Sequence, residues 1–215
     1  MKRKDEWRGN LIILFQPAEE VGSGARNIIK AGIFEKFPRP DFNLALHVSA
    51  DLPAGKVGYV PGWAMATVDS LDIPVKGRGG HGAYPHTTKD PIVMASQLIN
   101  SLQTIVSREI APIEAAVVTV GSIHGGTKHN VIPNEVRLQL TLRSYTDEVR
   151  NQTISTIRRM ARGLAEANGL PKDLYPEITL KDEYTPALFN NLELTEKLRI
   201  SFENVLGKDK VLKLS

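Results

Sequence analysis

The sequence contains no cysteine, so it has no disulfide framework and its thiol chemistry does not indicate a compartment. It also lacks any apolar run near the roughly 18 residues that a membrane span requires, and "LIILF" at 11–15 is too short and too polar-flanked for a signal sequence. Lys and Arg are scattered beyond a short "KRK", and the formal charge is only +3. We therefore expect a cytoplasmic protein with neither a membrane nor a nucleic acid as partner.

The composition is that of an ordinary globular protein, with 41% hydrophobic and 24% charged residues. In the first 60 residues, strands buried on both faces are expected at 11–15 and 42–48, and a third strand at 55–60. A short helix is expected to begin at Ser23 and to end at Gly32. Strand, helix and strand at this spacing predict an α/β layer with a parallel sheet.

A different pattern follows from about residue 65. Strands and helices are predicted in the order β-α-β-β-α-β, at 67–77, 90–108, 114–123, 136–144, 146–168 and 177–184. This order is that of a ferredoxin-like domain, in which both helices cover one face of the sheet. One more helix is predicted at 190–206. The fold class is thus α/β with an α+β insertion, and the expected domains are 1–64, 65–182 and 183–215.

Glu19 and Glu20 directly follow the strand expected at 11–15, and His47 lies near the end of the strand expected at 42–48. Ligands bind at the carboxyl ends of strands in open α/β sheets, so these side chains could meet in one cleft. One carboxylate and the imidazole would then hold a metal, while the other carboxylate moves protons. The competing interpretations are that the glutamates belong to a helix start and that His47 is a hydrogen-bonded core residue.

Two later stretches carry polar residues beside glycine. "KGRGGHGAYPH" at 76–86 places His81 among three nearby glycines, Gly79, Gly80 and Gly82, with His86 close behind. "GGTKHNVIPNEV" at 125–136 holds Asn130 just before a strand, and Arg143 lies at the far end of that strand. A glycine-rich turn with a surface histidine explains His81 equally well, and ordinary turn chemistry explains Asn130.

Together, "QPAEE", "ALHV", "GxGGHGAYPH" and "HNVIPNEV…LR" resemble the M20 metallopeptidases in order and spacing. The similarity covers essentially all 215 residues and is greatest to the amidohydrolase branch, which cleaves N-acyl amino acids. It implies a metal-dependent amidohydrolase acting on a small N-acyl amino acid or peptide, with Zn, Mn, Co or Ni as the divalent ion. It also implies that the 65–182 segment is a lid through which two copies form a homodimer.

The resemblance also implies a role for each candidate residue. Glu19 would be the general base, and Glu20 and His47 would be metal ligands. His81 would stabilise the oxyanion, and it is favoured over His86 because small residues flank it. The substrate carboxylate would be bound by Asn130 and Arg143.

The sequence departs from the family pattern at both ends. Family members carry an earlier His-x-Cys-Gly-His-Asp motif and a later histidine ligand, and neither is present here. We therefore expect this chain to correspond to the central part of a family member, with two ligands where a metal site normally has three or four. The alternative function is a catalytically inactive lid and dimerisation module. A third interpretation is an α/β protein whose motifs match by coincidence.

Spacing alone suggests that a site would be shared between copies. Asn130 and Arg143 are 13 residues apart along one strand, so they could be separated by up to about 40 Å. A bend at Pro133 would shorten this distance, but hardly enough for both side chains to reach one small substrate. In a two-fold dimer, Asn130 and His81 of one subunit could serve the site built around Glu20 and Arg143 of the other.

Overall fold

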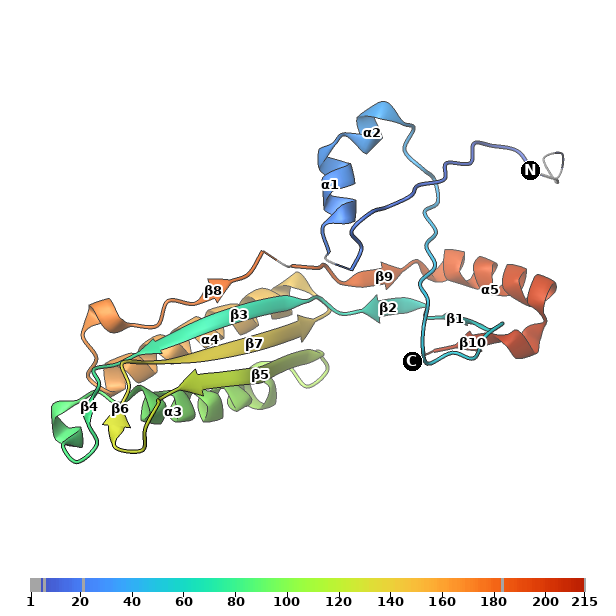
Figure 1. The fold of residues 1–215 in the computed structure, drawn as a ribbon. Helices are drawn as coiled ribbons and strands as arrows, with labels where there is room; N and C mark the ends of the chain where they lie inside the picture. Colours follow the sequence, from blue (N-terminus) through green and yellow to red (C-terminus); the bar gives the residue numbers. More distant parts are fainter. Residues whose placement is uncertain (1–4, 6, 21, 183, 215) are drawn as a thin grey trace. The chain divides into compact units, whose positions relative to one another are not determined.

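The computed structural model describes residues 5, 7–20, 22–182 and 184–214 (Figure 1). Its backbone divides into two compact units, Met1–Leu46 and His47–Ser215. Within the described ranges, every helix is too short or too polar to cross a membrane. The domain boundaries expected at residues 64 and 182 stay a prediction, because compactness alone divides the chain after Leu46.

The first unit contains two short helices, α1 (Gly24–Lys30) and α2 (Ile33–Lys36). Ser23 is the N-cap of α1 as predicted, although its side chain makes no capping hydrogen bond. Gly32 separates the two helices with φ = 79°, a left-handed conformation that glycine adopts without a steric penalty. The predicted stop of the first helix is thus confirmed.

The strands predicted at 11–15 and 42–48 are wrong for this chain. Neither segment forms regular secondary structure, and neither is hydrogen-bonded to a neighbouring strand in the described part of the structure. Their apolar side chains are exposed, with Phe15 at 88% and Leu46 at 81%. An all-apolar run becomes a buried strand only when other strands and a covering layer exclude water from it. Neither condition is met here.

The third predicted strand is confirmed as β1 (Val57–Tyr59), which pairs in parallel with β10 (Val211–Lys213) near the other end of the chain. Between them in sequence, α5 (Leu192–Leu206) matches the last predicted helix, and its N-cap Asn191 accepts a hydrogen bond from Leu194 N at 2.9 Å. The short turn η5 (Lys208–Lys210) joins α5 to β10. Residues far apart in sequence therefore form this small sheet.

The segment predicted to be a lid, for which that name is kept below, contains a four-stranded sheet with strand order β5-β7-β3-β8. Its strands are β3 (Asp69–Lys76), β5 (Ala116–Gly125), β7 (Glu135–Ser144) and β8 (Thr179–Leu180). β7 pairs antiparallel with both β3 and β5, so β3 and β5 run parallel with β7 between them. This is the split β-α-β arrangement that the sequence predicts.

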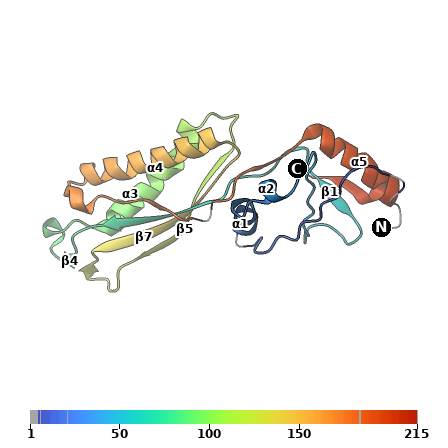
Figure 2. The same cartoon turned by 90° about the horizontal axis from the view of Figure 1, so that it is seen from above.

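Two helices cover one face of this sheet, α3 (Pro91–Thr104) and α4 (Asp147–Ala167), as Figures 1 and 2 show. Both begin as predicted: Asp90 accepts from Ile92 N at 2.8 Å, and Thr146 accepts from Val149 N at 3.3 Å. Alternate residues of β3 and β7 point into the core beneath the helices, where Leu71, Ile73 and Leu138 are fully buried. Period-two alternation in the strands therefore builds the core of the lid.

Shorter elements complete the second unit. A pair of strands that the sequence did not predict, β2 (Gly62–Met65) and β9 (Leu188–Asn190), forms an antiparallel neck beside the lid, and β4 (Gly80–His81) pairs with β6 (Val131–Ile132). The remaining helical turns are η2 (Pro85–Thr87), the π-helical turn η3 (Ile105–Glu109) and η4 (Lys172–Leu174). The strand predicted at 177–184 is limited to the two residues of β8.

Candidate active site

Glu19 and Glu20 lie in a turn ahead of α1, and both are exposed. The turn is closed by a hydrogen bond from Gly22 N to Glu19 O at 2.8 Å. The first turn of α1 contains no acidic residue. Interaction with a helix N-terminus therefore does not explain the two carboxylates in this structure.

The backbone around this turn is unusual in two respects. Ala18 has φ = 55°, the one positive value among described non-glycine residues. A Cβ on Gly24 would lie 1.7 Å from the carbonyl oxygen of Pro17, so that position accepts only glycine. A non-glycine residue in the left-handed region costs about 1 kcal/mol or more, and such residues cluster at functional sites. The strain at Ala18 immediately precedes Glu19.

His47 lies in an exposed segment without regular secondary structure at the beginning of the second unit. Its Nδ1 is 2.6 Å from the carbonyl oxygen of Val48. A carbonyl oxygen can only accept, so Nδ1 carries the proton in this contact and Nε2 keeps its lone pair in the neutral ring. A backbone carbonyl on one ring nitrogen is the usual arrangement for a histidine that binds metal through the other.

The donor chemistry of these three residues fits a divalent metal ion. Glu19, Glu20 and His47 offer carboxylate oxygens and one imidazole nitrogen, and all three are exposed to solvent. Zinc and similar ions accept these donor types, and exposure leaves the donors accessible to an ion.

His81 ends β4 at the tip of the lid, where it pairs with Val131 of β6. Its Nδ1 accepts a hydrogen bond from Ala83 N at 3.1 Å. In the neutral ring the proton is therefore on Nε2, which becomes a donor. The ring is exposed and lies 5.7 Å from that of Tyr84. His81 thus presents an N–H to solvent that could donate to an oxyanion.

Asn130 is brought next to His81 by the β4–β6 pair. Gly82 N donates to the backbone oxygen of Asn130 at 2.8 Å, and Asn130 itself is exposed. Gly79 makes this close approach possible, because a Cβ there would lie 2.4 Å from Ile132 O. The glycine-rich stretch therefore holds two of the predicted site residues at one tip of the lid.

Arg143 lies at the opposite end of the lid, on β7 and beside the neck. Its Nη1 is 3.5 Å from the carbonyl oxygen of Thr67, and the residue is partly buried. The eight-residue strand β3 separates this end from the His81 end (Figure 1), which corresponds to about 25 Å at 3.3–3.4 Å per residue. A single lid therefore cannot place Arg143 and His81 on one small substrate.

Two clusters near the neck were not predicted from sequence. Trp63 stacks on Tyr145 with ring centroids 5.4 Å apart and meets Phe189 edge-on at 5.0 Å. Thr67 and Ser144 hydrogen-bond through their side-chain oxygens at 3.1 Å, and both are buried. These contacts join residues more than 70 positions apart, so no local pattern in the sequence indicates them. They hold Ser144 and Tyr145, the two residues that directly follow Arg143.

Residues 61–168, just over half of the chain, match the family model described as the peptidase dimerisation domain of the M20 peptidases. The chain belongs to the M20 family. The match covers most of the lid, including His81, Asn130 and Arg143. The lid is therefore a dimerisation domain of this family, as the sequence motifs indicated.

Relatives and solved structures agree with this assignment. The chain is 42% identical over 200 residues to an N-acetyldiaminopimelate deacetylase of Leuconostoc mesenteroides, covering 91% of this chain and 52% of that protein. A proposed aminohydrolase from methicillin-resistant Staphylococcus aureus superposes with a TM-score of 0.80 at 32% identity, over 100% of this chain and 54% of the other. A dinuclear metal-binding M20 peptidase from Bacillus subtilis superposes with a TM-score of 0.61 at 27% identity, over 93% of this chain and 47% of the other. The chain thus spans about half the length of the proteins that it matches.

Proposed function

We propose that this chain is part of a metal-dependent amidohydrolase that releases a free amino acid from a small N-acyl amino acid. The observation that carries the proposal is the similarity to an N-acetyldiaminopimelate deacetylase over 91% of the chain. The mixed α/β fold and the M20 dimerisation domain support it. A cytoplasmic location is part of the proposal.

Glu20 and His47 are the proposed metal ligands. The Nδ1 contact of His47 to Val48 O supports this role, because a backbone carbonyl on one ring nitrogen is the usual arrangement for a histidine ligand. A bound divalent ion would polarise the substrate carbonyl and lower the pKa of a water molecule. Zn, Mn, Co and Ni all accept carboxylate and imidazole ligands, so each of them is a candidate for the bound ion.

Glu19 is the proposed general base. Its carboxylate would take a proton from the attacking water and later deliver it to the nitrogen of the departing amino acid, so that the amide C–N bond breaks and a carboxylate and an amine are released. His81 would donate from Nε2 to the oxygen that gains negative charge as the water adds to the carbonyl. The Ala83 contact supports this donor role, because it leaves the proton on Nε2.

Asn130 and Arg143 are proposed to bind the carboxylate end of the substrate. Arg143 offers a planar guanidinium, which matches a carboxylate, and Asn130 offers an amide donor. Since the two residues lie at opposite ends of one lid, we propose that they act on one substrate from two subunits. His81 and Asn130 of one copy would then complete the site of the other.

A homodimer through β5 would provide this arrangement. β5 is an edge strand of ten residues and contains neither proline nor lysine. Val117 and Ile123 along it are 47% and 51% exposed. A long edge strand without such protection is a template for pairing with another strand. Pairing of β5 with its copy across a two-fold axis would continue the sheet from one lid into the next.

The alternative is a lid module without catalytic activity. One observation favours it: the lid has a complete core, whereas the apolar segments at 11–15 and 42–48 are exposed. Under this alternative the chain dimerises but does not bind metal. The two proposals therefore differ in one directly measurable property.

The decisive experiment is the metal content of the purified chain by elemental analysis. We expect a near-stoichiometric divalent ion in the wild type and loss of that ion in Glu20→Ala and His47→Ala. Glu35→Ala serves as a matched control, because Glu35 is an exposed glutamate on α2 outside the proposed site. A wild type without metal, or variants that keep it, would favour the lid module.

A second experiment tests the shared site, with N-acetyldiaminopimelate and other N-acetyl amino acids as substrates. Asn130→Ala and Arg143→Ala should each be inactive alone. Subunit exchange in an equal mixture makes half of the dimers mixed, each with one intact site, so activity should recover to about one quarter of the wild type. If the wild type is active but the mixture of the two variants stays inactive, the site is not shared between subunits.

A further inference from the structure

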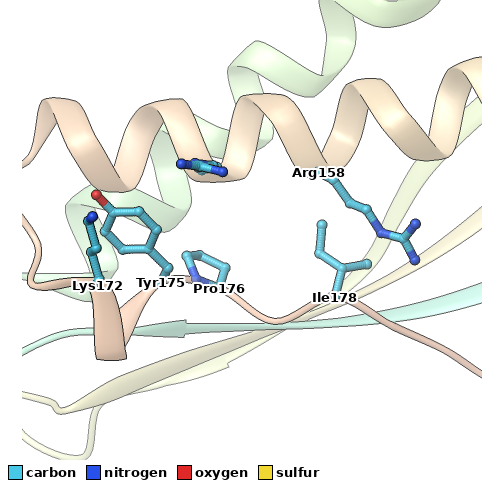
Figure 3. A pocket seen from close by; sticks show the side chains of 6 residues that line it. Arg158, Lys172, Tyr175, Pro176 and Ile178 are labelled. Atoms are coloured by element: carbon cyan, nitrogen blue, oxygen red, sulfur yellow. The ribbon is translucent and has the colours of Figure 1, made fainter.

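A cavity lies on the lid between α4 and the segment that follows it. Its volume is about 340 Å³, and it is lined by Arg158, Arg162, Lys172, Tyr175, Pro176 and Ile178. Figure 3 shows Arg158 reaching from α4, and Lys172, Tyr175, Pro176 and Ile178 on the segment below the helix. None of these residues belongs to the proposed active site, and the cavity has no carboxylate among its described lining residues.

Its positive charge is largely uncompensated. Arg158 and Arg162 are four residues apart on α4, where like charges repel each other. Arg162 forms an exposed ion pair with Glu166 at 3.0 Å. Within the described part of the chain, Arg158 and Lys172 have no ion-pair partner. The cavity therefore carries about two positive charges that the protein does not balance.

The floor of the cavity is apolar and firmly held. Tyr175 and Ile178 are partly buried and pack against the hydrophobic core of the lid. Pro176 between them restricts the backbone because its ring fixes φ. A fixed aromatic and aliphatic surface beside exposed cationic side chains suits a ligand with a flat apolar body and a charged head.

We propose that this cavity binds a phosphate monoester with an apolar, preferably aromatic, body. Guanidinium groups match phosphate oxygens through paired N–H donors, and lysine adds a point charge. A phosphate monoester carries about 1.5–2 negative charges at neutral pH, which corresponds to the unbalanced charge of Arg158 and Lys172. A carboxylate would bring only one charge. The apolar body would lie against Tyr175 and Ile178. This site is independent of the proposed catalytic activity.

The test is calorimetric titration of the 215-residue chain with phenyl phosphate. Inorganic phosphate, benzoate and phenol serve as comparison probes. We expect saturable binding of phenyl phosphate, weaker binding of inorganic phosphate and benzoate, and none of phenol. Binding of phenol as tight as that of phenyl phosphate would overturn the proposal, as would the absence of saturable phenyl phosphate binding. Benzoate binding at least as tightly would replace the phosphate assignment with a carboxylate.

Variants locate the binding. The double variant Arg158→Gln and Lys172→Gln should weaken phenyl phosphate binding about ten-fold, since each exposed charge contributes modestly. Lys208→Gln is the matched control, because Lys208 is an exposed lysine on η5 that does not line the cavity. The affinity of this variant for phenyl phosphate should stay within about two-fold of the wild-type value. Lys172→Arg should keep the affinity. Thermal unfolding of each variant checks that it is folded, and an unchanged affinity in the folded double variant would contradict the site.

Discussion

Arg150 of α4 donates two hydrogen bonds to Asp69 of β3, from Nε to Oδ2 at 2.7 Å and from Nη2 to Oδ1 at 2.6 Å. The carboxylate of Asp69 is only 2% exposed. The guanidinium also lies over the ring of Tyr184, with its carbon 4.2 Å from the centroid. One arginine therefore joins the outgoing strand, the second helix and the returning segment of the lid. This junction is close in sequence to Thr67, the residue that Arg143 contacts.

Asp69→Asn should strongly destabilise the lid. The substitution removes the negative charge that pairs with the largely buried guanidinium of Arg150. Breaking a buried ion pair by removing one partner costs about 3 kcal/mol. The free energy of unfolding from urea titration measures the loss. Asp72→Asn is the control on the same strand, because its ion pair with Lys181 is exposed and 3.7 Å long; its cost should be below about 1 kcal/mol. Equal costs would show that the Asp69 pair is not a structural anchor.

Tyr184 should make the stability of the chain fall at alkaline pH. Burial and the neighbouring carboxylate of Asp147, to which its hydroxyl donates at 3.2 Å, raise the pKa of the phenol above its usual value near 10. Above pH 10 the unfolded state loses this proton before the folded state does. The unfolded state then binds fewer protons, so the contribution of Tyr184 is complete below pH 10 and is lost as pH rises toward the folded pKa.

Tyr184→Phe removes this titration. Urea unfolding at several pH values from 8 to 11 should therefore show a shallower loss of stability in the variant than in the wild type. The difference between the two proteins should be constant below pH 9, where the phenol is protonated in both states. Parallel curves across the whole range would mean that the environment of Tyr184 does not shift its pKa.

The sequence predicted the lid well because its signals are local. Alternation in β7 and the capping residues Asp90 and Thr146 each act within a few positions, and the structure has the corresponding strand and helix starts. The prediction of strands at 11–15 and 42–48 was wrong for the opposite reason. Whether an apolar run is buried depends on neighbours far away in the chain, and the described structure provides none.

Among the candidate site and anchoring residues too, features set by local sequence could be predicted and those set by distant residues could not. The glycines around His81 indicated a close backbone approach, and the structure has it between β4 and β6. The distance between Asn130 and Arg143 could also be foreseen, because Asn130 precedes the strand and Arg143 lies near its far end. Asp69 and Arg150 could not be paired in advance, since 81 positions separate them and each is ordinary in its own surroundings.

Val117→Lys should weaken the proposed dimer. Val117 lies on β5 and is 47% exposed, and a lysine on an edge strand opposes pairing with another strand. In a two-fold pairing the substitution appears twice in the same interface, so the dimer dissociation constant should rise at least about ten-fold. Sedimentation velocity over a range of concentrations measures it. Val205→Lys on α5, where the valine is 78% exposed, is the matched control. A wild-type chain that is monomeric, or two variants that behave alike, would exclude β5 as the interface.

Gly79→Ala should separate His81 from Asn130 without unfolding the lid. A Cβ at this position would lie 2.4 Å from Ile132 O and 2.9 Å from the carbonyl carbon of Pro133, so the β4–β6 pair must move apart. Amide hydrogen exchange should accelerate for Gly82, whose N–H donates to Asn130 O, while amides of β3 and β7 keep their protection. Gly163→Ala is the control, because a Cβ there meets nothing within 4 Å. On a helix, alanine should instead stabilise the chain by up to about 1 kcal/mol. Unchanged exchange at Gly82 would mean that the tip tolerates a side chain, and the geometry of His81 would then not depend on this glycine.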